Sequence, residues 1–580
     1  PTYRIGWAVN TSATLTNNIN MSTYWNWNQL LEYTRQLGKH NFTLMASHES
    51  QESKWQNISA SRSGFLTNDV FDLSAGAAPG TNGGGSGPWA MESYLGRLNY
   101  NYDNRYLLTA TYRRDGSAVF GPENRWGDFP SVSAAWRVSR ESFFNVPFIS
   151  ELKLRYETGI TGNQGGGTGI YSPLNSGISD LGSGFLPGRY GNPALQWEET
   201  KTDNVGLNLG LLNNRITIEA DYFVKNSSNL LMDNPLPFYM GTSGQGSVAN
   251  PRVNIGELQT KGWSLTINTT NINKKDFRWE SSLNLSSFET EVKKFYNESA
   301  VVDRTSTWYD NWSQTWTQRA AVGLAPWLFR GYIFEGLFQS VEEINNSPVR
   351  VDGNGNRYPT DPTGIWVGDA KYKDVNGDGK IDSGDETYIG NPWPKLFGGL
   401  TNSFSYKGFD LSILVTGTSG NDIYNMLAMV NSKMGRFYTS RNLMTDVMNY
   451  ARLEDQNSKI VIANPETNVP RITGSQIPND NNYNVISSKW VEDGSFLRLK
   501  NVSLSYNLPN SLVQKLKVVR GVRATVGAQN LLTWTKYTGY DPEVGASVGA
   551  NVNAQNQAIG LDYGRYPLTP IYSFSLGVNF

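Results

Sequence analysis

The sequence contains no cysteine, only two histidines and few charged residues. The lack of thiols excludes disulfides and thiolate chemistry, and it mildly favours an exported chain, since large cytosolic proteins usually keep some thiols. His40 and His48 are too few for a His-rich metal site, and no catalytic triad is recognisable. Charged residues make up 17% of the chain, against ~25% in an average soluble domain. These absences give no support for an enzyme.

A dominant charge and long apolar runs are missing as well. The net charge of -1 provides no field that would draw the chain to nucleic acid or to an acidic membrane surface. No stretch approaches the ~20 apolar residues that a membrane-spanning helix needs. No signal peptide is visible, and Pro1 already lies within a strand-like pattern. We therefore expect this chain to lack an N-terminal region.

What the sequence does contain is alternation with a period of two, rich in aromatics and glycine. Leu152, Leu154 and Tyr156 alternate with Lys153 and Arg155. A strand face that carries several charges cannot lie in a dry sandwich core. It can face the wet lumen of a barrel whose other face meets lipid. The segment therefore predicts a membrane strand with outward apolar and inward charged side chains.

The same alternation recurs in roughly sixteen segments, mostly near the ~9–11 residues that a tilted membrane strand needs. We predict strands at 1–9, 24–36, 40–52, 91–101, 105–113, 130–138, 151–159, 200–211, 215–225, 260–269, 276–286, 397–406, 409–417, 496–507, 521–531 and 571–580. This predicts an all-β chain that forms a transmembrane antiparallel up-and-down β-barrel.

Short turns and long loops are sorted along the chain. Short turns are predicted at 38–39, 103–104, 213–214 and 407–408, and long loops near 53–90, 160–199, 226–259, 287–396, 418–495 and 532–570. Outer-membrane barrels have short periplasmic turns and long extracellular loops. With this polarity the last strand descends, so we expect Phe580 in the periplasm.

One strand changes phase. Leu497 and Leu499 share one face, whereas Val502 and Leu504 share the other. A β-bulge near 500–501 would restore a continuous outward face.

Aromatic side chains lie on outward phases near strand ends, where membrane girdles are found. They are Trp25, Trp27, Tyr33, Trp263, Trp279 and Tyr572.

A series of short motifs carries a family resemblance. In order they are RRDGS at 113–117, FG at 120–121, RWGDFPSVS at 125–133, TGNQ at 161–164, GNPALQWE at 191–198, DVNGDGKID at 374–382, GNPWP at 390–394, SFLRLKNV at 495–502, AQNL at 528–531 and YDPE at 540–543. Their order and spacing resemble the SusC/RagA-type TonB-dependent transporters of Bacteroidetes, from about residue 91 to Phe580.

The resemblance implies a 22-stranded barrel with an N-terminal plug in its lumen. It also implies a SusD-like surface lipoprotein as a lid, energy from the TonB complex, oligosaccharide or peptide as cargo, and a dimer of transporter–lid pairs. Residues 1–580 show no plug and no TonB box. We therefore expect the C-terminal part of the barrel domain, without the plug and the first strands.

One acidic segment has calcium-ligand spacing. Asp374, Asn376, Asp378, Lys380, Asp382 and Asp385 stand at positions 1, 3, 5, 7, 9 and 12 of an EF-hand-like loop, with Gly379 at position 6. Asp385 replaces the usual Glu, so bidentate coordination is less assured. The alternative is a turn held by its own hydrogen bonds. Either way we expect a structural role that stiffens the loop 335–395.

Trp308, Trp312 and Trp316 recur at a spacing of four. On a short helix they would form one stripe, exposed for stacking on sugar or for holding a lid protein. The alternative is a helix packed under its own loop.

Three segments are interpreted structurally. The Gly-rich run 81–87 lacks the Lys-Ser/Thr of a phosphate loop, so a mobile loop is predicted. The charges of 113–115 and Arg125 are expected to pair with other rim residues rather than clamp a substrate. The acidic segment 352–356 is predicted to be a turn.

Three functions remain open on this evidence. The first is a nutrient importer of the outer membrane. The second is a soluble secreted β-protein, either a glycan-binding module or a glycosidase, which would have a dry core on one strand face. The third is a passive porin, which would conduct freely where a plugged importer is closed.

Overall fold

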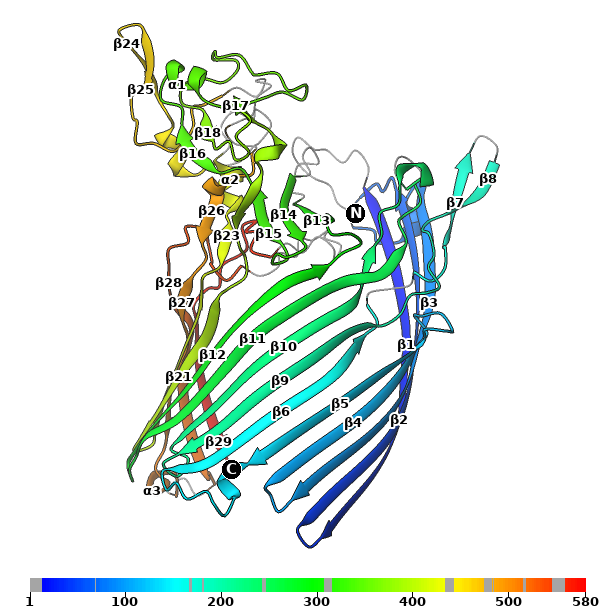
Figure 1. Cartoon of the computed structure of the whole chain (residues 1–580), viewed down its shortest axis with the longest axis vertical. Coiled ribbons are helices and arrows are strands. Elements are labelled where there is room, and N and C mark those ends of the chain that lie inside the picture. The colour runs from blue at the N-terminus through cyan, green and yellow to red at the C-terminus, as the bar shows by residue number, and fades with distance from the viewer. Residues whose placement is uncertain are drawn as a thin grey trace. The chain divides into compact units, whose positions relative to one another are not determined.

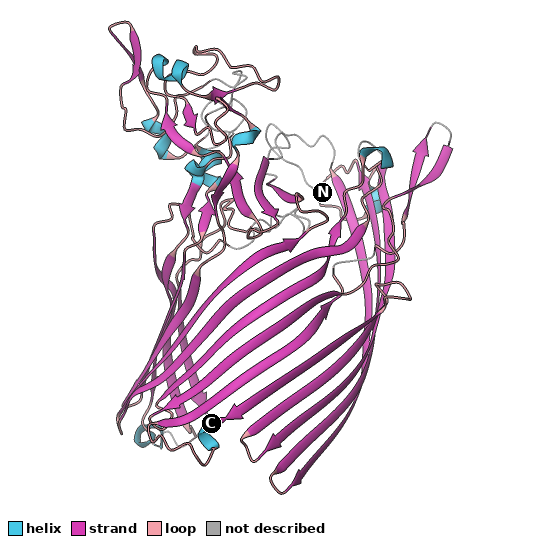
Figure 2. Cartoon of the chain, viewed as in Figure 1, coloured by secondary structure: helices cyan, strands magenta, loops and turns pink. Residues whose placement is uncertain are grey.

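The computed structural model describes residues 13–67, 69–165, 169–179, 182–242, 247–306, 315–432, 443–473, 482, 485–514, 518–544 and 559–580. Long strands dominate these residues, and the helices are short (Figure 2). Backbone contacts divide the chain into two compact units. The first comprises 1–142, 154–204 and 225–257, and the second comprises 143–153, 205–224 and 258–580.

One antiparallel sheet of 15 strands forms the framework, with neighbours in chain order (Figure 1). The strands are β1 (Thr14–Leu37), β2 (His40–Ser63), β3 (Ala78–Tyr102), β4 (Tyr106–Ser117), β5 (Trp126–Arg137), β6 (Ile149–Asn163), β9 (Glu198–Leu211), β10 (Ile216–Asp233), β11 (Arg252–Asn273), β12 (Phe277–Lys294), β21 (Leu396–Tyr406), β22 (Phe409–Ser419), β27 (Phe496–Asn507), β28 (Gly521–Thr535) and β29 (Ile571–Asn579). Fifteen predicted strands coincide with them, and the sixteenth, 1–9, lies outside the described residues.

The two faces of β6 follow the predicted alternation. Leu154 and Tyr156 are 45% and 49% exposed, whereas the side chain of Arg155 is 15% exposed and donates to Glu157 Oε1 at 3.2 Å. A water-soluble sandwich would reverse this order, with leucine hidden and arginine outside. The outward apolar face of this strand is therefore confirmed.

The predicted short turns are present. Their residues adopt left-handed backbone at Gly38, Asp103, Asn104, Asn213, Asn214, Lys407 and Gly408, with φ between 45° and 90°. Two-residue hairpin turns that match the strand twist require positive φ, and Gly, Asn and Asp accept it at lowest cost. Local turn chemistry thus closes these hairpins where the sequence indicated.

The predicted bulge is also present. Leu499 pairs with Val415 of β22, but Asn501 pairs with the next residue, Leu414, so Lys500 is the additional residue. The register with β28 shifts at the same place, opposite Asn530, whose φ is 53°. This bulge returns Val502 and the residues after it to the outward phase.

The Gly-rich run corrects one prediction, because 81–87 is not a loop but part of β3. Gly85 and Gly87 pair with Asn57 and Trp55 of β2. A Cβ added at Gly87 would lie 2.8 Å from the indole nitrogen of Trp55, so the ring occupies the space that a side chain would need. A side chain here would displace the Trp55 ring, so close packing favours glycine, whereas composition alone suggested flexibility.

The connections contain further short elements. They are η1 (Leu73–Ala75), η2 (Val138–Arg140), β7 (Leu174–Ser179), β8 (Gly182–Pro187), η3 (Phe238–Met240), β13 (Val301–Ser306), β14 (Thr315–Ala321), β15 (Leu328–Gly331), β16 (Phe334–Leu337), α1 (Val341–Asn346), β17 (Val349–Arg350), β18 (Ala370–Tyr372), β19 (Lys380–Ile381), η4 (Ser383–Asp385), β20 (Thr387–Gly390), β23 (Asp422–Tyr424), α2 (Met426–Asn431), η5 (Thr445–Asn449), β24 (Leu453–Gln456), β25 (Lys459–Ile462), η6 (Ser488–Trp490), β26 (Val491–Asp493) and α3 (Asn510–Val513). Among the described helices, none combines the length and apolar character needed to cross a membrane.

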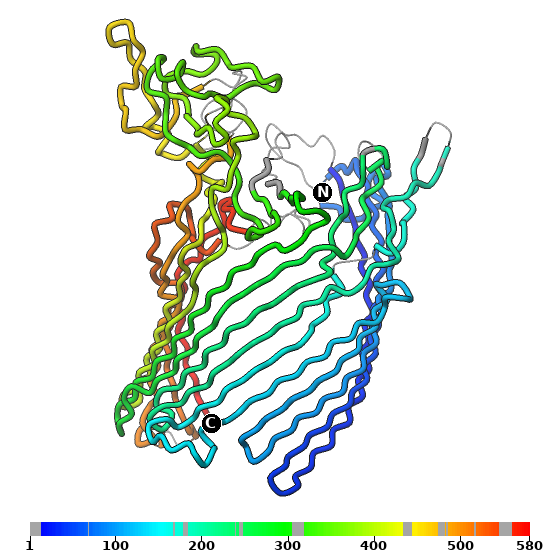
Figure 3. Tube along the Cα trace, in the orientation of Figure 1, coloured from blue at the N-terminus to red at the C-terminus, as the bar shows by residue number. Residues whose placement is uncertain are grey.

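Three connections of the second unit have hydrophobic cores of their own. We name the described residues of 328–395, 420–495 and 536–570 the loop assembly, and its members the first, second and third loop segments (Figure 3). One cluster joins Phe338, Ile344 and Val367 of the first segment with Ala451 and Ile462 of the second. Loops that share a buried core are ordered by packing as well as by turns.

Candidate functional site

Several of the short motifs meet in an aromatic cluster of the first unit. Phe120 and Phe129 contact Trp197 with ring centroids 5.3 and 5.4 Å apart. The indole N–H of Trp197 donates to the carbonyl of Arg125 at 3.0 Å. Leu195 completes the cluster and is buried. Three motifs separated in sequence therefore form one packed junction.

Polar contacts join the TGNQ motif to the RRDGS motif in the same unit. The amide oxygen of Gln164 accepts from Ser117 Oγ at 2.7 Å and from Trp89 Nε1 at 3.3 Å. Arg113 Nε donates to Asp115 at 2.8 Å, and Arg114 lies 3.7 Å from Asp128. The predicted pairing is confirmed for Arg113 and Arg114, and for Arg125 it stays a prediction.

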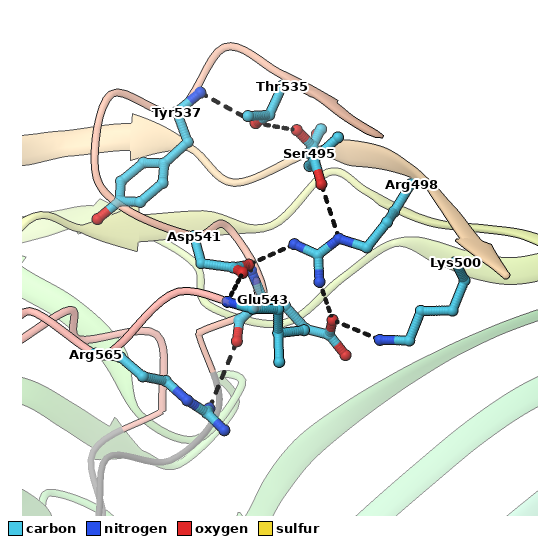
Figure 4. A network of polar contacts seen from close by, with 10 residues as sticks. Ser495, Arg498, Lys500, Thr535, Tyr537, Asp541, Glu543 and Arg565 are labelled. Atoms are coloured by element: carbon cyan, nitrogen blue, oxygen red, sulfur yellow. Dashed lines mark hydrogen bonds and ion pairs between the residues drawn. The ribbon is translucent and has the colours of Figure 1, made fainter. Parts of the chain in front are cut away.

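In the second unit, a buried arginine anchors the third loop segment to strand β27 (Figure 4). The side chain of Arg498 is 2% exposed and donates to Asp541 at 2.5 Å and to Glu543 at 2.6 Å. Its Nε donates to Thr533 Oγ1 at 2.9 Å. All three guanidinium nitrogens are therefore bound, as a buried charge requires.

The carboxylate of Asp541 accepts further hydrogen bonds besides that from Arg498. Asp541 also accepts from the backbone N–H groups of Glu543 at 2.9 Å and Leu568 at 3.0 Å. Burial alone would raise the pKa of Asp541, but these bonds and Arg498 outweigh it and hold the pKa below its ordinary value. Lys500 lies 3.3 Å from Glu543 and adds a more exposed cation.

Before the structure, these residues were known only as members of two motifs, SFLRLKNV and YDPE. The available signal was a charge at Arg498 between two outward leucines, just before the phase change. The charge indicated that the side chain of Arg498 points inward. Its carboxylate partners lie more than forty residues away, so no local sequence pattern could predict them.

A second buried ion pair links the first and second loop segments. Arg471 donates to both carboxylate oxygens of Asp369, at 2.6 and 3.0 Å. Asn482 donates to Asp369 Oδ1 at 2.8 Å, and the backbone N–H of Trp366 donates to Oδ2 at 2.8 Å. Every acceptor of the carboxylate is used, which is the condition under which a buried pair is tolerated.

The acidic loop is closed by hydrogen bonds of its own. Asp374 accepts from the N–H groups of Gly377 at 2.6 Å and Gly379 at 2.8 Å, and the latter contact lowers the pKa of Asp374 most. Asp385 is fully buried and accepts from Val375 at 2.8 Å. Within the described residues, no three carboxylates or imidazoles converge in a metal-binding arrangement.

The turn alternative thus describes the loop as it stands, and the segment 352–356 is also a turn, as predicted. Asp352 Oδ1 accepts from the N–H groups of Asn354 and Asn356 at 2.9 and 2.8 Å.

The tryptophan stripe is not supported as one helix. Trp308 and Trp312 lie outside the described residues, and Trp316 lies in strand β14, paired with Thr305.

A hydrophilic cavity of about 290 Å³ lies against the sheet of the second unit. Its lining includes Thr217, Glu280, Ser282, Thr401 and Ser403. Ser282 pairs with Thr401, and Glu280 pairs with Ser403, so these four side chains stand on one face of β12 and β21. Hydroxyl and carboxylate groups line this face of the sheet.

Comparison with known proteins gives the same fold. A family model described as "TonB dependent receptor-like, beta-barrel" matches residues 2–391. TonB-dependent receptor P26 of Formosa agariphila is 33% identical over 574 residues, which are 96% of this chain and 53% of that protein. TonB-dependent receptor SusC of Bacteroides thetaiotaomicron is 29% identical over 550 residues, 90% of this chain and 48% of that protein.

Solved structures agree at the level of fold. A chain of the RagAB peptide transporter matches with a TM-score of 0.77 at 24% identity, covering 97% of this chain and 56% of that one. The RagAB peptide importer in its open-open state matches with a TM-score of 0.79 at 23% identity, covering 100% and 57%. The chain therefore spans about half the length of the relatives that it matches.

Proposed function

Because the chain belongs to the TonB dependent receptor-like β-barrel family, we propose that it acts as the barrel wall of an outer-membrane nutrient importer of the SusC/RagA type. The family consists of transporters and receptors, and its members work in the outer membrane. The observation that carries the proposal is the β6 wall, where Leu154 and Tyr156 are exposed while Arg155 is shielded. Apolar side chains on successive outward positions, with charged side chains shielded on the other face, are the pattern of a strand whose outer face meets lipid.

The partners proposed for this importer follow from the family. A SusD-like surface lipoprotein would cover the extracellular mouth, and the TonB complex would supply energy through an N-terminal plug. Residues 1–580 would then be the C-terminal part of the barrel domain, with Phe580 in the periplasm. The cargo would be an oligosaccharide or a peptide, and two transporter–lid pairs would associate as a dimer.

The test uses the intact transporter in its native membrane. We expect extraction only with detergent, a heat-dependent change in gel mobility, and co-purification of a surface lipoprotein. Uptake of a fluorescent oligosaccharide or peptide pool should stop when TonB is deleted. Extraction without detergent would contradict the membrane assignment, and uptake without TonB would indicate a passive pore.

A calcium site in the acidic loop is a further proposal. The ligands would be Asp374, Asn376, Asp378, the carbonyl of Lys380, Asp382 and Asp385, with positive φ at Gly377 and Gly379 giving the sharp turns. The ligand types suit calcium, which prefers 6–8 oxygens, since four of these side chains are carboxylates. Binding would require these carboxylates, which do not converge in the hydrogen-bonded turn, to draw together around the ion.

Terbium luminescence, competed by calcium, measures occupancy of this loop directly. We expect the signal to be lost in Asp378→Asn together with Asp382→Asn. The matched control is Asp352→Asn in the neighbouring acidic turn, which should keep the signal. Equal luminescence in all three proteins would refute the site.

Trp308, Trp312 and Trp316 stay proposed as contacts for cargo or for the lid. Supporting this, they lie in the sequence between strands β12 and β21, and aromatic faces can stack on sugars. Alanine substitution of each should weaken binding of cargo or lipoprotein, measured by pull-down, and leave heat-modifiable mobility unchanged.

A further inference from the structure

A series of hydrogen bonds connects the three segments of the loop assembly to one another, and the bonds of Arg498 join the third segment to strand β27. Its two carboxylate partners, Asp541 and Glu543, belong to the third segment. The first step therefore fixes residues 541–543 to strand β27, next to the bulge at Lys500.

The second step runs within the third segment, from 537–543 to 562–568. The N–H of Leu568 donates to Asp541 at 3.0 Å, and Arg565 donates to the carbonyl of Glu543 at 3.5 Å. Tyr537 donates its hydroxyl to Asp562 at 2.6 Å, and Asp562 is buried. The stretch around Asp562 thus cannot shift without breaking contacts to 537–543.

The third step joins the third segment to the second. The N–H of Tyr424 donates to the carbonyl of Gly560 at 2.9 Å, and the N–H of Asp562 donates back to Tyr424 at 3.0 Å. The N–H of Leu427 donates to the carbonyl of Asp562 at 3.0 Å. Tyr424 is fully buried, so these bonds are protected from water.

The fourth step joins the second segment to the first. Asp422 and Asn391 exchange two bonds: the N–H of Asp422 donates to the carbonyl of Asn391 at 2.7 Å, and the N–H of Asn391 donates to Asp422 Oδ2 at 2.8 Å. Gly560 has a φ of 72°, and a Cβ there would lie 2.7 Å from Pro392 Cβ. The junction of all three segments therefore has no space for a side chain.

A shared apolar core fills the same junction. It contains Phe329 of the first segment, Leu561 of the third, and five residues of the second: Tyr424, Met426, Met429, Ile486 and Trp490. Packed side chains from all three segments resist independent movement, because sliding any one of them would open a void.

We propose that Arg498 is a positioning residue: by fixing 541–543 to the barrel wall, it sets the position of all three loop segments, which move as one body. The proposal rests on the proposed function only in one respect: if the protein is an importer, these segments present its extracellular surface to the cargo. The coupling between the segments does not depend on transport.

Hydrogen exchange of the purified full-length protein in detergent tests this coupling without any cargo. In Arg498→Gln, we expect exchange at the amides of Tyr424, Leu427, Asp422 and Asn391 to rise at least tenfold, together with that of Glu543 and Leu568. The strand amides of β21 and β22 should not change. The matched control is Lys500→Gln, which loses only the exposed contact to Glu543 and should change exchange less than twofold.

Faster exchange confined to Glu543 and Leu568 would overturn the proposal, because the third segment would then move alone. If Arg498→Gln fails to show heat-modifiable mobility, Arg498→Lys replaces it under the same criterion, since it keeps the charge but loses the forked geometry. Gly560→Ala, which leaves Arg498 intact, should also accelerate exchange at Tyr424 and Asn391, and unchanged exchange there would likewise overturn it. Loss of TonB-dependent uptake is read separately, so failure of the importer assignment leaves this result interpretable.

Discussion

Asp369 and Arg471 form a buried charge pair within the loop assembly, with side chains 2% and 9% exposed. Asp369→Asn keeps the shape but leaves the arginine charge without a counter-ion. Removing one partner of a buried pair costs about 3–5 kcal/mol. We expect pulse proteolysis to show faster cleavage of the loop assembly, with the barrel unaffected.

Lys371→Met is the matched control, because Lys371 pairs with Glu343 at 2.9 Å with both side chains more than a quarter exposed. Such pairs contribute about 0–1 kcal/mol. Equal sensitivity of the two variants to protease would contradict the importance given to burial.

Lys489 supports a pH prediction. Burial lowers its pKa from 10.5 to about 8, although its Nζ lies 4.9 Å from the Phe334 ring and 5.2 Å from the Trp490 ring and donates to the carbonyl of Asn468. Between pH 8 and 10.5 the unfolded state binds more protons than the folded one, so stability rises with pH in that window.

The free energy of unfolding of the loop assembly should therefore be higher at pH 10 than at pH 8. The Lys489→Met variant should lack this part of the increase. The comparison of the two proteins by pulse proteolysis removes the contribution of other titrating groups. If the unfolding free energies of the two proteins changed in parallel with pH, the pKa of Lys489 would not be lowered in the folded protein.

At the scale of single elements, the two faces of β6 make opposite demands. Leu154→Lys places a charge on the lipid side and should cost about 2–4 kcal/mol if it lies near the bilayer midplane. Lys153→Leu, one residue earlier on the opposite face, should cost less than about 1 kcal/mol. Refolding of each variant into lipid vesicles, followed by heat-modifiable mobility, measures the difference, and an inverted order would contradict the assigned faces.

The bulge in β27 sets which face of the strand the later residues occupy. Deletion of Lys500 would remove the additional residue and turn Val502 and Leu504 toward the wet face. We expect no heat-modifiable protein from this deletion. Lys500→Ala keeps the residue count and should assemble normally, so equal assembly of both variants would exclude a register role.

The positions of the strands could be predicted from the sequence, but the full lengths of β2 and β3 could not. Alternation located the strands and even the phase change at Lys500, because one face must be apolar throughout. The extension of β2 beyond 52 and of β3 before 91 was missed, because Gly85 and Gly87 lower strand propensity while Trp55 covers them. That compensation lies on the neighbouring strand and has no local signature.

The contacts of the candidate site were less predictable for a similar reason. Arg498 and Asp541 are 43 residues apart, and Asp369 and Arg471 are 102 apart. Their motifs were visible, but pairing depends on how long loops return to the same place. Contacts that close within a few residues, such as the turn of Asp352, could be derived locally.

At the scale of the whole molecule, the separate cores of the loop assembly predict two unfolding events. The loops are held by clusters such as that around Phe338 and Val367, whereas the strands are held by continuous backbone pairing. Regions with distinct cores open with distinct free energies. Calorimetry of the protein in detergent should show a lower transition that Asp369→Asn shifts and a higher one that it leaves in place; a single transition shifted as a whole would contradict this.

The hairpin of β24 and β25 projects from the loop assembly (Figure 1), with Asn457 and Ser458 at its tip in left-handed conformation. Its strand Leu453–Gln456 is exposed throughout. The tip takes no part in the contacts that run from Arg498 to Asn391, so a short epitope or a dye-labelled cysteine inserted between Asn457 and Ser458 should leave those contacts undisturbed. Residues 1–580 contain no cysteine, so within them the label would occupy a single defined position, and under the proposed function it would report whether this hairpin faces the cell exterior.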